Sequence, residues 1–173
     1  RLYVGLLKIS FKSTLQVSIY SFYKSTRLEK TMSIIHYETR HVNNFKELLE
    51  SSARLFPARP AFKIRAKDGS ISEMKYPKLL NIVNALGTAL CSLGLKAKHI
   101  AIMGKNSHKW CISYFGITNG TGVVVPIDKE LMPDQIINFT SLAECDAVFI
   151  SPSLKEKLGS LLENSGIKYI ITE

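Results

Sequence analysis

Residues 104–128 constrain the fold more than any other part of the chain. Asn106 and Ser107 are residue types that favour the start of a helix, and apolar residues recur at helical spacing after them. Gly120 and Gly122 then interrupt the chain before three consecutive valines. This order predicts a helix, a glycine turn and a strand, and the run of valines predicts a strand that is buried on both faces.

Similar patterns continue over most of residues 44–172, so the chain predicts alternating helices and strands. Apolar residues recur at helical spacing after Asn44, Pro77, Ser107, Pro133 and again from Leu154. Short apolar runs lie at residues 99–104, 123–125, 147–150 and 168–172. Such alternation predicts βαβ units, in which right-handed crossovers place helices on the faces of a parallel sheet.

A β-hairpin is predicted before the first βαβ unit. Phe62 and Ile64 alternate with basic residues, and Asp68 with Gly69 is a typical hairpin turn before the return strand. The predicted fold class is therefore α/β, with a partly parallel sheet, flanking helices and this hairpin.

The first predicted helix carries two further expectations. Asn44 and Glu47 have the spacing of a capping box, in which each side chain binds the other residue's backbone N–H. Its apolar residues are expected to share one buried face; these are Phe45, Leu48, Leu49, Leu55 and Phe56.

The net charge of +9 is spread unevenly along the 173 residues. Residues 1–31 contain six Lys or Arg and one Glu, which predicts a basic extension or upstream sequence outside the folded domain, with Met32 as a candidate start. A transit peptide and a membrane-surface anchor are alternatives. The longest uncharged run there, residues 13–23, is too short for a transmembrane helix, which needs about 20 residues. Residues 32–173 are only mildly basic, which does not predict binding to nucleic acid.

The three cysteines, Cys91, Cys111 and Cys145, are isolated in apolar patterns. Disulfide frameworks and zinc sites need paired spacings, which these residues lack. They are expected to be buried and reduced, as in a cytoplasmic protein.

No stretch of the chain predicts a catalytic, cofactor-binding or metal-binding residue. The glycines of residues 119–122 follow a helix, whereas a phosphate loop precedes one, so a turn is predicted. Asp128 ends a parallel strand, where ligands bind in open α/β sheets, but a turn-forming role is favoured. Trp110 is expected to anchor the core, with His108 and Lys109 facing solvent.

The order of several motifs also gives the chain a family resemblance. The motifs are a Tyr-x-x-Leu helix entry at Tyr76, an Asn-Ser-x-x-Trp helix start at Asn106, and a Val-Val-Pro-Ile-Asp strand ending at Asp128. In this order and spacing, the region from Phe45 to Glu173 resembles the beginning of the AMP-forming acyl-CoA synthetases, which are adenylate-forming enzymes.

The resemblance implies that residues 32–173 are the N-terminal part of an AMP-binding domain that is truncated at its C-terminus. The complete enzyme would use ATP and Mg²⁺ to activate a carboxylic acid and would transfer it to coenzyme A. The family's glycine-rich loop and catalytic lysine would lie beyond Glu173. The fragment alone would then be inactive and bind no cofactor.

Within this family, long-chain fatty acyl-CoA ligases match best. Pro133 follows the Pro-x-Asp at residues 126–128 without the aromatic residue that precedes it in peptide-synthetase adenylation domains. Such an adenylation domain remains one alternative, and a stand-alone non-enzymatic α/β interaction module is another. A truncated parallel sheet leaves an open edge and an uncovered face, so residues 32–173 expressed alone are predicted to aggregate or to bind hydrophobic dyes.

Overall fold

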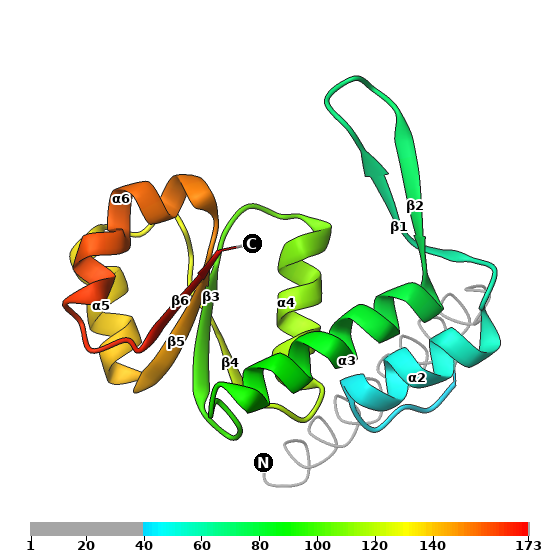
Figure 1. Cartoon of the computed structure of the whole chain (residues 1–173), viewed down its shortest axis with the longest axis horizontal. Coiled ribbons are helices and arrows are strands. Elements are labelled where there is room, and N and C mark those ends of the chain that lie inside the picture. The colour runs from blue at the N-terminus through cyan, green and yellow to red at the C-terminus, as the bar shows by residue number, and fades with distance from the viewer. Residues whose placement is uncertain (1–39, 173) are drawn as a thin grey trace, which may run out of the picture. The chain divides into compact units, whose positions relative to one another are not determined.

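The computed structural model describes residues 40–172 (Figure 1). The predicted basic extension and Met32 lie outside the described residues. The described elements follow one another as α2 (Phe45–Leu55), β1 (Pro60–Arg65), β2 (Ile71–Lys75), α3 (Tyr76–Ser92), β3 (His99–Met103), α4 (His108–Thr118), β4 (Val123–Pro126), α5 (Pro133–Leu142), β5 (Cys145–Ile150), α6 (Pro152–Glu163) and β6 (Tyr169–Thr172).

The main sheet has four strands in the order β4-β3-β5-β6, and every neighbouring pair is parallel. β1 and β2 form a separate antiparallel hairpin, which projects beyond the helices in Figure 1. The α/β class, the parallel sheet and the hairpin before the first βαβ unit are thus confirmed.

Side chains on β3 alternate between two apolar clusters, one on each face of the sheet. Ile100 and Ile102 pack with residues of α3 and α4, whereas Ala101 and Met103 pack with residues of α5 and α6. All four β3 side chains are fully buried. The alternation follows from the strand period of two, and it explains why the strand is apolar throughout.

The helices start and end where the sequence supplies the appropriate residues. Pro77 lies in the first turn of α3, and Gly94 follows its end with a φ of +76°, a conformation that glycine adopts without strain. Gly166 follows the end of α6 in the same conformation, with a φ of +85°. These boundaries are therefore set by local chemistry.

The first helix differs from its expected form in two ways. Asn44 accepts the Glu47 N–H at 2.9 Å, but the Glu47 carboxylate binds Asn43 instead of completing the box with Asn44. The expected apolar face is also only partly buried, because Leu55 and Phe56 lie at the end of α2 and are 54% and 36% exposed.

Two serines of α2 are buried where apolar residues were expected. Ser51 and Ser52 are buried, and their hydroxyls donate to backbone carbonyls one turn earlier in α2. The internal hydrogen bonds satisfy the hydroxyls and allow a polar residue at a buried position. Leu49 is the only hydrophobic side chain of α2 that is buried, and it packs with Leu79 and Val83 of α3.

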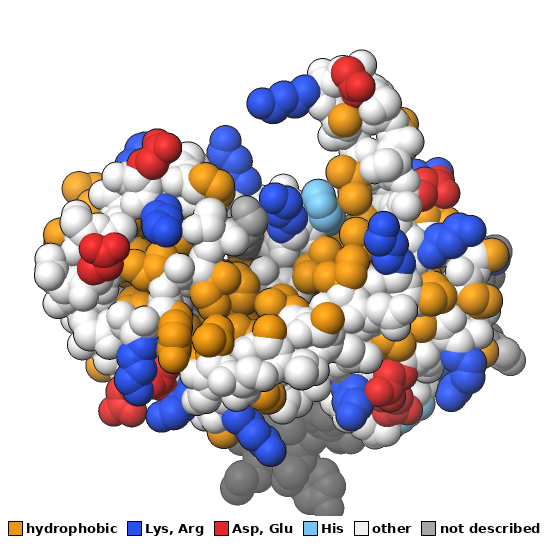
Figure 2. Space-filling model, in the orientation of Figure 1, with side chains coloured by type: hydrophobic (Ala, Val, Ile, Leu, Met, Phe, Trp, Pro, Cys, Tyr) orange, Lys and Arg blue, Asp and Glu red, His pale blue; other side chains and the backbone are white. Residues whose placement is uncertain are grey.

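The sheet has two edge strands among the described residues, β4 and β6. Tyr169, Ile170 and Ile171 of β6 are only half-buried. Apolar side chains gather near β6 and along α3 on the face shown in Figure 2. Both features agree with the expected open edge and partly uncovered face.

Candidate binding groove at the end of β4

An apolar groove of about 370 Å³ lies beside the carboxyl end of β4. Its lining comes from β4, the following turn and α5; the residues are Val125, Pro126, Ile127, Asp128, Leu131, Phe139, Leu142 and Ala143. In open α/β sheets, ligands and partners commonly bind at the carboxyl ends of parallel strands. The groove is therefore the candidate binding surface of the described residues.

Asp128 is the only charged residue in the lining of this groove. Its carboxylate accepts the backbone N–H of Glu130 at 3.0 Å, which closes the turn between β4 and α5. The turn-forming role favoured by the sequence is the role that this contact supports. Because every other lining side chain is apolar and this carboxylate is held in the turn, the groove mainly offers apolar surface for binding.

The strand beside the groove corrects one expectation. The three valines of β4 were predicted to be buried on both faces, but Val123 is 51% exposed. The reason is its place in the sheet, because β4 pairs only with β3 and has no second neighbour within residues 40–172. A central-strand sequence thus occupies an edge position.

The glycine turn before β4 has a steric function. A Cβ atom on Gly122 would lie 2.5 Å from the carbonyl oxygen of Lys98, and Gly120 has a φ of +99°. The backbone also donates from Ala97 N–H to the Thr121 carbonyl at 2.7 Å. The turn joins α4 to β4, as predicted, and these contacts account for its glycines without a phosphate ligand.

The start of α4 is partly as expected. Ser107 accepts the Trp110 N–H at 3.0 Å and caps the helix, and Trp110 stacks on Tyr114 with ring centroids 5.5 Å apart. Trp110 is half-buried and packs against the apolar cluster beneath α3 and α4, so it is only partly the core anchor that was expected. His108 is not simply solvent-facing, because it is half-buried with its ring 6.4 Å from that of Phe62.

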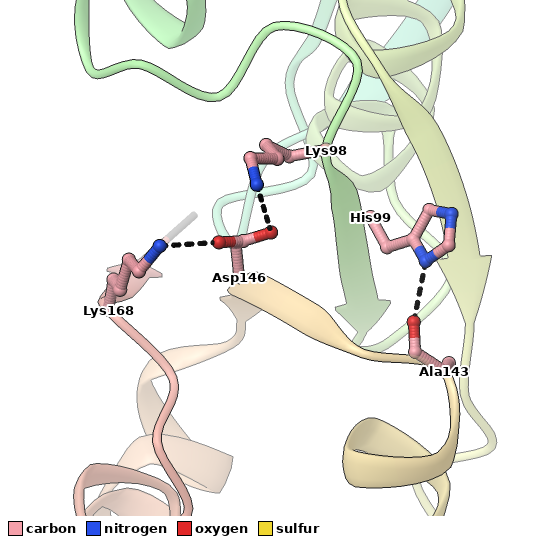
Figure 3. A network of polar contacts seen from close by, with 5 residues as sticks. All are labelled: Lys98, His99, Ala143, Asp146 and Lys168. Atoms are coloured by element: carbon pink, nitrogen blue, oxygen red, sulfur yellow. Dashed lines mark hydrogen bonds and ion pairs between the residues drawn. The ribbon is translucent and has the colours of Figure 1, made fainter.

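A polar network joins the strands at the other end of the sheet, beside their amino termini (Figure 3). Asp146 binds Lys168 at 2.8 Å and lies 3.6 Å from Lys98, and the Lys168 hydrogen bond holds the pKa of Asp146 below its ordinary value. Beside it, the His99 Nδ1 lies 2.6 Å from the Ala143 carbonyl oxygen. All these groups have partners, so the network ties β3, β5 and β6 together. Sequence reasoning missed it, although Lys98 and Lys168 each directly precede a strand.

The three cysteines differ in how far they are buried. Cys145 is buried in β5, and burial raises the pKa of its thiol, with the charge of Asp146 adding to the effect. Cys91 is exposed on α3, which contradicts the expectation that all three are buried. Its side chain lies on the outer face of α3. Within residues 40–172, no group of three or more His, Cys, Asp or Glu side chains is arranged to hold a metal ion.

Comparison with known proteins identifies the family. Residues 49–172 match the family described as AMP-binding enzyme. The chain therefore belongs to the AMP-binding enzyme family, a family of adenylate-forming enzymes. Comparison with curated proteins gives no match.

Solved structures of related enzymes share the fold at low sequence identity. The inhibitor-bound N-terminal domain of FACL13 from Mycobacterium tuberculosis is 18% identical with a TM-score of 0.66, and the match covers 76% of this chain and 34% of that one. The long-chain-fatty-acid-CoA ligase FadD1 from Archaeoglobus fulgidus is 16% identical with a TM-score of 0.67, covering 80% and 29%. The anthranilate CoA ligase AuaEII, in complex with anthranoyl-AMP, is 19% identical with a TM-score of 0.66, covering 78% and 26%. This chain thus spans about a third or less of the length of these proteins.

No helix between residues 40 and 172 is both long enough and apolar enough to cross a membrane.

Proposed function

We propose that this chain forms the first part of the large domain of an ATP-dependent acyl-CoA ligase. In that reaction the carboxylate of the acid attacks the α-phosphate of ATP and releases pyrophosphate. The thiol of coenzyme A then attacks the acyl-adenylate carbonyl, and AMP leaves. The observation that carries the proposal is the family match over residues 49–172.

The names of the fold neighbours favour a fatty acid as the substrate. FadD1 is named as a long-chain-fatty-acid-CoA ligase, and another fold neighbour is named as a fatty acyl CoA synthetase from Mycobacterium tuberculosis. The segment after Asp128 also lacks the aromatic residue typical of peptide-synthetase domains. AuaEII has the same fold and is named for anthranilate, so the fold alone does not select the acid. The acid is therefore best identified by assay.

The described residues contribute structure to this enzyme. They build a layer of parallel sheet with helices on both faces, and their polar network and glycine turn have structural partners. ATP, Mg²⁺ and coenzyme A are assigned to the complete enzyme. The cytoplasm is the proposed compartment, on the basis of the unpaired cysteine spacings.

The test compares two proteins in an ATP–pyrophosphate exchange assay with fatty acids, aryl acids and amino acids. The 173-residue chain is expected to show no exchange, and the product of its full coding frame is expected to exchange with fatty acids and to form the CoA thioester. Exchange by the 173-residue chain would contradict its proposed inactivity. Exchange with amino acids would support an adenylation domain, and a full product without any exchange would support an interaction module.

A further inference from the structure

We draw no further inference here: the strongest candidate, the cluster where α4 and α6 begin at the carboxyl ends of the neighbouring strands β3 and β5, consists of two helix N-termini beside the exposed side chains of Lys105 and Lys109, and among residues 40–172 no buried polar side chain without a partner lies there to indicate a ligand.

Discussion

Gly122 provides a direct test of how the structure explains the glycine turn. A Cβ atom added there would lie 2.5 Å from the Lys98 carbonyl oxygen, which is backbone and cannot rotate away. That oxygen also accepts the Val123 N–H at 2.9 Å, so relieving the clash would disturb the first hydrogen bond between β3 and β4. Overpacking of this kind costs about 1–3 kcal/mol, and a weakened hydrogen bond adds about 1 kcal/mol. Gly122→Ala is therefore expected to lower the free energy of unfolding by about 2–4 kcal/mol.

Two other glycines separate the possible causes of such a loss. Gly120 has a φ of +99° but open space at its Cβ position, so Gly120→Ala tests backbone conformation alone and should cost about 1–2 kcal/mol. Gly159 lies within α6 with its nearest neighbour at an ordinary 3.7 Å, so Gly159→Ala should stabilise the protein by up to about 1 kcal/mol.

Urea unfolding, followed by the fluorescence of the single tryptophan and by circular dichroism, would rank these variants. The expected order of stability is Gly159→Ala, wild type, Gly120→Ala and Gly122→Ala. A Gly122→Ala variant as stable as Gly120→Ala would refute the steric explanation, since it would show that the β3–β4 backbone can move apart at little cost.

Three further measurements test other contacts. The hydrogen bond from Lys168 lowers the pKa of Asp146 from its ordinary value of 3.8. Near neutral pH the wild type should therefore be more stable than Asp146→Asn by up to about 1 kcal/mol, and this difference should disappear as the pH falls below about 3.8. A stability difference that does not change with pH would argue against the ion pairs. Ser107→Ala should lower the free energy of unfolding by about 1 kcal/mol, because it removes the cap of α4. Ser151→Ala should lower it less, because the Ser151 side chain makes no cap hydrogen bond with α6. Equal losses of stability in urea unfolding would contradict this explanation. In native protein, a thiol reagent counted by mass spectrometry should modify exposed Cys91 well before buried Cys145, and equal rates would place Cys145 nearer the surface.

Local patterns predicted most of the fold because the interactions that define it are local. Helix starts at Asn44 and Ser107 depend on side chains that reach backbone N–H groups two or three residues away. The end of α3 depends on Gly94 in the same way. Such signals are complete within a few residues, so they can be read without knowledge of the rest of the structure.

The details that could not be predicted depend on which elements become neighbours. Leu55 and Ser52 both fit an amphipathic helix, and only the packing around α2 leaves the leucine exposed and the serine buried. Asp146 finds Lys98 and Lys168 because β5 lies between β3 and β6, an order that no local pattern specifies. The groove beside β4 arises in the same manner, from the packing of α5 against a strand edge.

β4 shows what such a disagreement between sequence and structure can reveal. Its three valines are suited to a strand with neighbours on both sides, yet Val123 is 51% exposed at an open edge. Proteins usually protect an exposed edge with charges or prolines, and here only Pro126, at the end of the strand, serves that purpose. The sequence of β4 is therefore better matched to a covered edge than to an exposed one, and the side chains of Phe139 and Leu142 extend the same mismatch onto α5. Any element that covers this edge would remove the mismatch on both elements at once.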